Sequence, residues 1–257
     1  MCRLLGIYGH TDLWQDIAMA FSRQAHSGNV PPGMEKKPGH RDGWGITVSN
    51  QNQTTMIPVI RQLGSASESL SFREVIRTMP QPPGIFLCHL RKASDIIPIN
   101  LSNVHPFCHN GWAIIHNGTV FNARSLPRSP DLVSCSDDSD TEYFFHYLLT
   151  KIGDRTAQRS AALSIAEAVA SIRTDYSALN CILSNGRELY AIRKYKQWED
   201  YYTLYTYELP GSVVISSQPV SVPQLDPDNW KLLPNNLLLR IYDNPLRFER
   251  LPISCSS

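Results

Sequence analysis

The sequence predicts an α+β fold in which a few helices cover antiparallel sheets. Short apolar segments recur along most of the chain, and stretches rich in Gly, Pro, Asn and Ser separate them, which is typical of antiparallel strands. Only a few longer segments carry apolar residues at the spacing of a helix. With 257 residues, of which 42% are hydrophobic and 18% charged, the chain has enough apolar material for a sizeable core.

The first third of the chain is expected to alternate strands and helices. Apolar runs predict strands at residues 3–8, 44–49, 56–60 and 85–91, with a turn at residues 51–53. Asp12 is the expected N-cap of a helix that continues to about residue 25. A second helix is expected over residues 67–79, because Pro80, Pro82 and Pro83 cannot continue it. Residues 27–43 form a long Pro- and Gly-rich loop, a kind of loop that is often functional.

The remaining strands are expected around two further helices. Ser139-Asp-Thr-Glu142 before an apolar run is a capping box, which predicts a helix start, and another helix is expected over residues 157–173. Asn185-Gly186 between two apolar runs predicts a hairpin with a type I′ turn. The other expected strands lie at residues 112–116, 201–207, 212–217, 237–242 and 246–251. We expect a single domain over residues 2–257, with the last stretch of roughly 40 residues at its periphery.

Charge and cysteine content argue against several classes of protein. The formal net charge of +1 and the scattered Lys and Arg residues give no reason to expect nucleic acid or a membrane as a partner. Asp12 and Asp16 interrupt the start of the chain, so no signal peptide is expected, and no apolar run approaches membrane length. The expected compartment is therefore the cytoplasm, where the cysteines would be reduced thiols. They are Cys2, Cys88, Cys108, Cys135, Cys181 and Cys255.

The most unusual feature is Cys2, which follows the initiator methionine and leads directly into an apolar segment. If Met1 is removed, one residue carries both a thiol nucleophile and a free α-amine that can act as its base. Reference pKa values of roughly 8.5 for the thiol and roughly 7.8 for the amine place the proton transfer within about 1 kcal/mol. With Met1 retained, the nitrogen is an amide and cannot act as a base. The alternative is that Cys2 is a small apolar residue that starts a strand.

Two polar clusters at strand ends suggest groups that bind charge. His89-Leu-Arg91 ends an apolar strand, and the planar fork of Arg91 suits a substrate carboxylate, although an internal salt bridge would explain it equally well. His116-Asn117-Gly118 ends another strand, where a side-chain amide beside a backbone N–H offers the two donors of an oxyanion hole. Taken alone, Asn117-Gly118 is also an ordinary turn.

Two further clusters have structural explanations that do not exclude a function. Ser139 would cap a helix and leave Asp140 free to receive a substrate ammonium group. In Asp42-Gly-Trp-Gly45 the glycines permit close backbone approach at the start of a strand.

Taken together, these motifs resemble the class II glutamine amidotransferase domain, the family whose nucleophile is an amino-terminal cysteine. Its stand-alone, YafJ-like members, which begin Met-Cys and carry His-Arg-Asp-Gly-Trp-Gly, are the most similar. The ordered set covers roughly the first 150 residues and is far more specific than any one motif. It comprises Cys2-Arg-Leu-Leu-Gly6, Asp42-Gly-Trp-Gly45, His89-x-Arg91-x-Ala93-Ser94, Asn103-x-His105-Pro106, His116-Asn-Gly118 and Ser139-Asp-Thr-Glu142.

The resemblance implies a fold and a reaction. The implied fold is the four-layer αββα sandwich of the amino-terminal nucleophile (Ntn) hydrolases. Cys2 would attack the γ-carboxamide of glutamine or of a γ-glutamyl compound, release the amine and leave a γ-glutamyl thioester that water cleaves. The α-amine would serve as base and then as acid, and neither a cofactor nor a metal is expected.

The resemblance also implies roles for individual residues. The catalytic residues would be Cys2 and the oxyanion-hole donors Asn117 (side chain) and Gly118 (backbone N–H). Arg91 would bind the substrate α-carboxylate and Asp140 its α-ammonium group, with His105 in a supporting role. The segment from Arg91 to about residue 100 would close over the substrate. Many members carry an Arg-Gly pair upstream of Asp42 where this chain has Gly39-His40-Arg41, so the role of that arginine does not transfer to Arg41.

Three alternatives stay open at the level of sequence. His89, His105, Cys108, His109 and His116 are close in sequence, but their spacing matches no standard zinc pattern. An inactive domain that binds or regulates a synthase would also keep the fold. Within the enzyme hypothesis, the ammonia would pass to a separate synthase subunit, or the enzyme would be a plain hydrolase of a small γ-glutamyl substrate.

Overall fold

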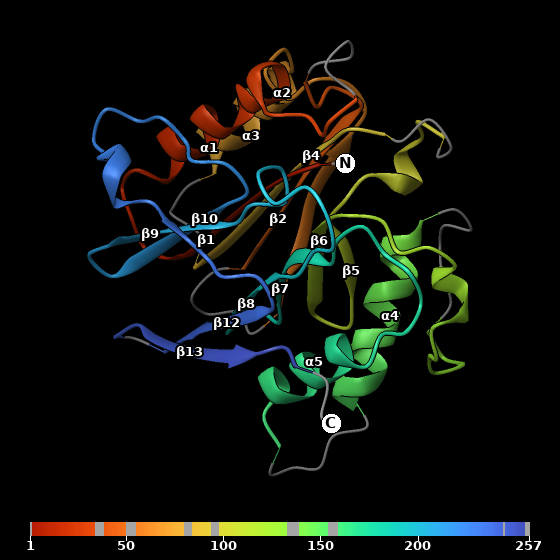
Figure 1. The fold of residues 1–257 in the computed structure, drawn as a ribbon. Coiled ribbons are helices and arrows are strands. Elements are labelled where there is room, and N and C mark those ends of the chain that lie inside the picture. Colours follow the sequence, from red (N-terminus) through yellow and green to blue (C-terminus); the bar gives the residue numbers. More distant parts are fainter. Residues whose placement is uncertain are drawn as a thin grey trace.

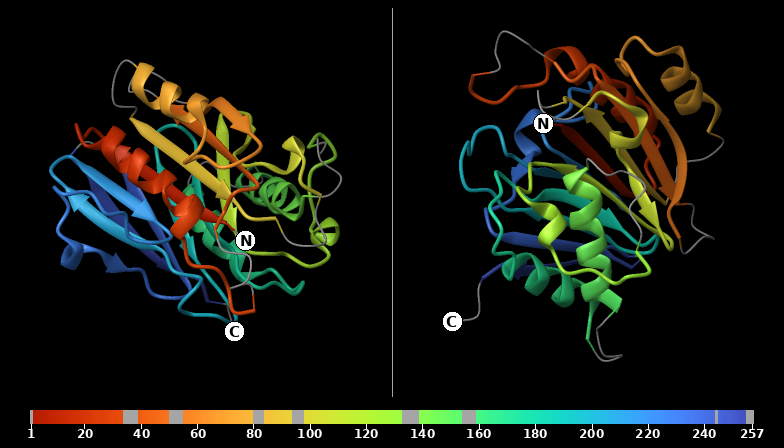
Figure 2. Two further views of the ribbon diagram at one scale, coloured as in Figure 1. Left: turned by 90° about the horizontal axis from the view of Figure 1, so that it is seen from above. Right: turned by 90° about the vertical axis from the view of Figure 1, so that its right-hand side faces the viewer.

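In the computed structural model, two antiparallel sheets lie face to face and helices cover their outer faces (Figure 1). The structure describes residues 2–33, 39–49, 55–79, 84–93, 98–132, 139–153, 159–243 and 245–254. The turned views in Figure 2 show the same order of layers: helices, sheet, sheet, helices. The expected α+β class and four-layer αββα arrangement are therefore confirmed.

The first sheet has seven strands in the order β11-β9-β10-β1-β4-β2-β3. They are β1 (Arg3–Gly9), β2 (Gly43–Ser49), β3 (Ile57–Gln62), β4 (Ile85–Arg91), β9 (Tyr205–Leu209), β10 (Ser212–Ser216) and β11 (Lys231–Leu232). The amino-terminal strand β1 lies in the middle, where Leu5 is paired with Ser216 of β10 on one side and Cys88 of β4 on the other. This central position fixes the first residues of the chain.

The second sheet has six strands in the order β13-β12-β8-β7-β6-β5. They are β5 (Phe107–His109), β6 (Trp112–Asn117), β7 (Asn180–Ser184), β8 (Leu189–Arg193), β12 (Leu237–Tyr242) and β13 (Arg247–Pro252). The late strands thus extend both sheets, β11 in the first and β12 with β13 in the second. The extent of the domain over residues 2–257 stays a prediction.

Two groups of helices form the outer layers (Figure 1). The helices α1 (Trp14–Ser22), α2 (Gln24–Ser27) and α3 (Leu70–Thr78) cover the first sheet, and α4 (Asp140–Gly153) and α5 (Ala161–Ala170) cover the second. Short 3-10 turns occur at Leu101–Asn103, Ala123–Ser125 and Pro227–Asn229. None of the helices in the described ranges is long and apolar enough to cross a membrane.

Three apolar cores fill the spaces between the four layers. Along β1, Leu5 and Ile7 pack with α1–α3, whereas Leu4 packs in the core between the two sheets. Along β6, Ile115 faces that central core and Ile114 faces α4 and α5. Successive strand residues point to opposite faces, so a strand between two layers must be apolar on both. This explains why the central strands appear in the sequence as continuous apolar runs.

Three helices begin at other residues than expected, and in two of them a serine side chain caps the helix. The helix α1 begins at Trp14 with Leu13 at the N-cap position, so Asp12 is not the cap. Ser69 accepts a hydrogen bond from the backbone of Phe72 and starts α3 three residues later than expected. In the same way, Ser160 caps α5, so this helix does not begin at residue 157.

The hairpin of β7 and β8 is confirmed, but its turn is not type I′. Only Gly186 has a positive φ, of 88°, whereas a type I′ turn requires positive φ at both central residues. The side chain of Asn185 accepts hydrogen bonds from the backbone N–H groups of Arg187 and Glu188. The connection between the strands is therefore longer than a two-residue turn. The expected turn at residues 51–53, the three prolines after α3, Cys135 and Cys255 lie outside the described residues.

Candidate active site

Cys2 lies beside the ends of β4 and β6, because the next residue, Arg3, pairs with Leu90 of β4 and the backbone of Cys2 contacts Asn117 of β6. It directly precedes β1, and its side chain is only 8% exposed. Its backbone nitrogen donates a hydrogen bond of 2.8 Å to Oδ1 of Asn117, the last residue of β6. This bond joins the first sheet to the second and brings together two residues that the sequence analysis assigned to catalysis.

Hydrogen bonds to the side-chain oxygen of Asn117 fix the orientation of its amide. Besides the Cys2 nitrogen, the hydroxyl of Tyr201 donates to Oδ1 from 3.5 Å. Because Oδ1 is used in this way, Nδ2 points in the other direction. This nitrogen is buried and has no hydrogen-bond partner among the described residues. Leaving a buried donor unsatisfied is costly, so Nδ2 is a donor available to a bound molecule.

Only glycine fits at position 118. A Cβ atom there would lie 1.9 Å from the backbone oxygen of Ala178. His116, two residues earlier, contacts the same oxygen: its Nε2 is 3.1 Å from the Ala178 oxygen, and its Nδ1 is 2.9 Å from Oγ1 of Thr141. A carbonyl oxygen can only accept, so Nε2 carries the proton. Burial lowers the pKa of His116, which favours this neutral form. The turn after β6 is therefore tightly fixed.

Arg91 ends β4 with a buried guanidinium that is only partly used. Its Nη2 donates to the backbone oxygen of Pro98 at 3.0 Å, while Nη1 is buried and lacks a partner within the described ranges. Asp42 holds the segment that follows, because its carboxylate accepts a hydrogen bond of 2.7 Å from the backbone of Ala93. In the part of the chain that is described, Arg91 makes no ion pair.

Asp140 is the first residue of α4, where the helix dipole favours a negative charge. Its Oδ2 accepts a hydrogen bond of 2.7 Å from the backbone N–H of Val120, just after the Asn117-Gly118 turn. The carboxylate of Asp140 therefore lies beside the turn that contains Asn117 and Gly118. Ser139, the expected cap, is buried, and its backbone oxygen accepts from the N–H of Glu142.

His105 lies beneath the site against a second histidine. Its ring centroid is 4.2 Å from that of His89, and its Nδ1 accepts a hydrogen bond of 3.3 Å from the backbone of His116. Gly45 permits this arrangement, because a Cβ at Gly45 would lie 2.2 Å from the backbone oxygen of His105. Burial, followed by the charge of His89, lowers the pKa of His105 well below its usual value.

His89 is the neighbour that most affects the reactive thiol besides the amino terminus. Burial raises the pKa of the Cys2 thiol and is the largest single effect. The charge of the amino terminus, the His89 imidazole and a hydrogen bond from the backbone of Lys92 act in the opposite direction and prevail, so the pKa falls from 9.0 to about 6. Neither ring nitrogen of His89 makes a hydrogen bond of normal geometry to a described residue. These effects favour the thiolate form of Cys2.

Three residues near Cys2 had no role in the sequence analysis. Tyr201 contacts Asn117, and the guanidinium of Arg3 lies 5.0 Å from the Tyr201 ring centroid. His40 is fully buried, neither ring nitrogen has a described partner, and burial and then the charge of Arg3 lower its pKa well below the usual value. Arg3 and His40 lie within the family motifs given above, so their position in the sequence could have identified them. Tyr201 lies in a late segment with no motif. Arg41 is exposed.

The candidate metal ligands do not gather into a site. Within the described residues, no group of three or more His, Cys, Asp and Glu side chains could hold a metal ion. His109 lies against His146 of α4, with ring centroids 5.6 Å apart, whereas His89, His105 and His116 surround the Cys2 region. The histidines are thus divided between two places.

The sequence matches known proteins over most of its length. A family model described as class II glutamine amidotransferases matches residues 1–207. An uncharacterized protein of Methanocaldococcus jannaschii is 27% identical over 202 residues, which are 76% of this chain and 52% of the relative. The chain therefore spans about half the length of that curated relative.

Solved structures show the same fold at low identity. The allosteric regulatory enzyme of purine biosynthesis matches with a TM-score of 0.66 and 17% identity, over 99% of this chain and 50% of its own. Glutamine phosphoribosylpyrophosphate amidotransferase from B. subtilis matches with a TM-score of 0.62 and 18% identity, over 97% and 49%. A class II domain protein from Silicibacter pomeroyi matches with a TM-score of 0.61 and 16% identity, over 98% and 100%.

Proposed function

The chain belongs to the class II glutamine amidotransferases and has their Ntn-hydrolase fold, and from this we propose that it hydrolyses the γ-amide of glutamine or of a γ-glutamyl compound. The observation that best supports this is the contact between Cys2 and Asn117. The nitrogen that would be the catalytic base, the thiol, and an amide with an unused Nδ2 donor all converge there. The pKa of the thiol is lowered to about 6, which favours the thiolate, the reactive form of the nucleophile.

The proposed first step is attack of the Cys2 thiolate on the γ-carbonyl carbon. The developing oxyanion would receive hydrogen bonds from Nδ2 of Asn117 and the backbone N–H of Gly118. The Cys2 α-ammonium would give its proton to the leaving nitrogen, and the amine would then activate the water that cleaves the γ-glutamyl thioester. This scheme requires removal of Met1, which lies outside the described residues.

Arg91 and Asp140 would bind the two charged groups at the other end of the substrate. Arg91 offers its unused Nη1 donor to the α-carboxylate, and Asp140 offers a carboxylate to the α-ammonium. We assign His105 a supporting role, because it packs on His89 and accepts the hydrogen bond from the His116 backbone. The assignment of the segment after Arg91 as a closing loop falls partly on residues 94–97, outside the described ranges.

The fate of the released nitrogen divides the proposal into two versions. In one, a separate synthase subunit accepts the ammonia, and in the other the protein is a plain hydrolase. We favour the hydrolase, because a large cleft beside the site offers room for a leaving group bigger than ammonia. The four described cysteines are free thiols, which supports our inference of a reducing compartment such as the cytoplasm.

The test is glutamate release by protein whose loss of Met1 has been verified by mass. We expect turnover of L-glutamine or of a γ-glutamyl compound, and none in Cys2→Ala. The competing candidate is an inactive domain that regulates a synthase. Absence of turnover across a γ-glutamyl panel by Met1-free protein would favour that candidate and contradict the proposal.

A further inference from the structure

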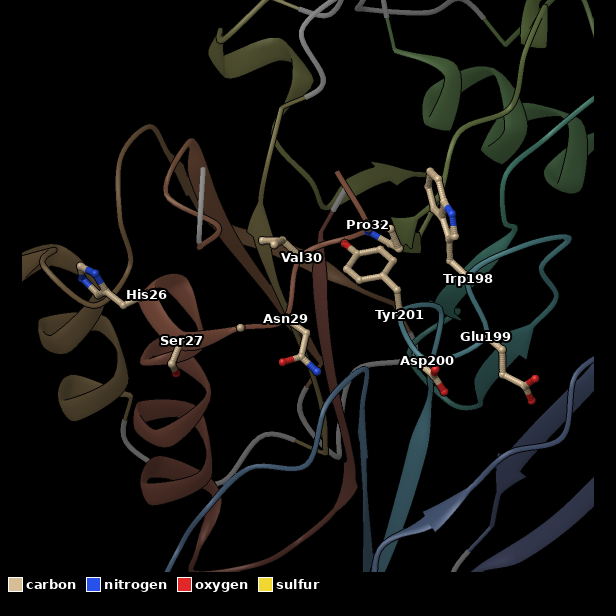
Figure 3. A pocket seen from close by; sticks show the side chains of 10 residues that line it. His26, Ser27, Asn29, Val30, Pro32, Trp198, Glu199, Asp200 and Tyr201 are labelled. Atoms are coloured by element: carbon tan, nitrogen blue, oxygen red, sulfur yellow. The ribbon is translucent and has the colours of Figure 1, made fainter. Parts of the chain in front are cut away.

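A cleft of about 720 Å³ lies next to the proposed active site. One wall is the segment from His26, near the end of α2, to Pro32, and the other is the turn from Trp198 to Tyr201 before β9 (Figure 3). Ammonia is about the size of water, whose share of liquid volume is roughly 30 Å³. Clefts of several hundred Å³ are instead typical of sites for small organic molecules. The cleft is therefore far larger than ammonia would require as a leaving group.

Tyr201 connects the cleft to Cys2. Its ring lines the cleft, and its hydroxyl lies 3.5 Å from Oδ1 of Asn117, the atom that accepts from the Cys2 nitrogen. The Arg3 guanidinium, next to Cys2 in the chain, lies over the same ring and donates to the backbone oxygen of Asn29, which also lines the cleft. The cleft and the thiol are therefore separated by one side chain.

The cleft shares no lining residue with the proposed contacts for the substrate carboxylate and ammonium groups. The proposed carboxylate and ammonium contacts come from the end of β4 and the start of α4, and neither element contributes to the cleft. A γ-glutamyl group bound by Arg91 and Asp140 with its γ-carbonyl at Cys2 would direct the amide substituent away from both residues. The open space beyond Tyr201 is available to that substituent.

An exposed indole gives the cleft a planar apolar wall. Trp198 is 38% exposed, although its ring stacks on Tyr202 at 6.0 Å with an interplanar angle of 19°. Its backbone has a φ of 59°, unusual for a residue other than glycine. The N–H groups of Tyr201 and Tyr202 both donate to the Trp198 oxygen, at 3.0 and 2.9 Å, and hold the turn in this shape. The indole is thus fixed at the cleft rather than folded into the core.

The charges that line the cleft disfavour an anion. Glu199 and Asp200 are exposed and come from the same turn as Trp198, although in Figure 3 their side chains point away from the indole. Among the described residues that line the cleft there is no lysine or arginine, and His26 is paired with Glu68 at 3.2 Å. A leaving group with a carboxylate would therefore meet two like charges, whereas a neutral or cationic one would not.

From these contacts we propose that the cleft is the leaving-group subsite, and that the preferred substrates are γ-glutamyl amides of bulky, planar amines without a negative charge. This rests on the proposed function and narrows it. The Cys2 sulfur forms a bond to the carbonyl carbon of the γ-amide, and the C–N bond of that amide breaks with its electron pair going to nitrogen. That nitrogen takes a proton from the Cys2 α-ammonium, and water then cleaves the thioester and restores the thiol. The net reaction consumes one water and yields glutamate and the free amine.

The experiment compares kcat/KM for L-glutamine, γ-glutamyl-4-nitroanilide and γ-glutamyl-3-carboxy-4-nitroanilide, all with Met1-free protein. We expect the neutral anilide to be a better substrate than glutamine, and the carboxylated anilide to be worse than the neutral one. In Trp198→Ala the ratio of anilide to glutamine kcat/KM should fall about fivefold to tenfold, the loss of an aromatic contact. Asp200→Asn should reduce the discrimination against the carboxylated anilide about threefold, and more so at low salt.

Matched variants separate a local effect from a general one. Leu163→Ala on α5 and Glu74→Gln on α3 are exposed changes of similar kind away from the cleft lining and should leave both ratios unchanged. If Trp198→Ala does not fold, Trp198→Phe should keep most of the preference because it retains an aromatic wall.

The outcomes distinguish the two proposals. Turnover of glutamine with unchanged ratios in Trp198→Ala and Asp200→Asn would overturn the subsite and leave the proposed function intact. No turnover of any of the three compounds would overturn both.

Discussion

Replacing His89 with glutamine should raise the pKa of the Cys2 thiol. With the pKa lowered from 9.0 to about 6, roughly nine-tenths of the thiol is ionised at pH 7, against about one-hundredth for an ordinary cysteine. His89 lowers the pKa of the thiol through its charge, and one such neighbour typically moves a pKa by about 1 to 3 units. His89→Gln should therefore bring the pKa to about 7 or above and reduce the thiolate at pH 7 to about half or less.

The assay is the rate of alkylation by iodoacetamide as a function of pH, followed at Cys2 by peptide mass. Because the pKa is lowered, the thiolate is present above about pH 6 and is lost as the pH falls below it. Burial raises the pKa of Cys88, Cys108 and Cys181, so these thiols should react slowly. His109→Gln, which changes a histidine that lies against His146, should keep the inflection near 6. An inflection near 9 in the unmodified protein, or one unmoved by His89→Gln, would refute the reasoning.

Three further predictions concern the residues around Cys2. Asn117→Ala removes an oxyanion donor and should lower kcat for glutamate release about 10²- to 10³-fold, and a loss of less than tenfold would argue against that role. Arg91→Ala should cost about 2 to 3 kcal/mol in kcat/KM for L-glutamine but little for an analogue without the α-carboxylate, and equal losses for both would exclude the clamp. Gly118→Ala would place a Cβ 1.9 Å from the Ala178 oxygen and should lower the melting temperature by about 5 °C or more. Gly153→Ala, with nothing within 4 Å of the new Cβ, is its control and should leave stability unchanged or slightly raised.

The layers of the fold were predictable because each leaves a different apolar pattern. The central strands β4 and β6 are buried on both faces and appear as continuous apolar runs, so their positions were expected nearly to the residue. Helix and turn boundaries that depend on side-chain hydrogen bonds were harder to predict. Ser69 and Asn185 each compete with equally plausible neighbours, and only the folded backbone shows which oxygen is in reach.

Sequence motifs predict the residues of the candidate site but not the contacts that join them across the sheets. The motifs select Cys2, Arg91, Asn117 and Asp140, whereas the bond from the Cys2 nitrogen to Asn117 depends on how β1 and β6 are placed in different sheets. No motif in the sequence indicated that Tyr201 would lie near Cys2. It comes from a late turn whose position relative to Asn117 is a consequence of the sandwich rather than of any local pattern.

The central claim is that Cys2 is an activated nucleophile in a site that recognises glutamine. The most direct test is the intact mass of Met1-free protein after incubation with 6-diazo-5-oxo-L-norleucine, followed by peptide mapping. The account predicts a single adduct on Cys2, protection by L-glutamine, and no adduct in Cys2→Ala. An unmodified protein, or an adduct on another cysteine while Cys2 stays free, would contradict it.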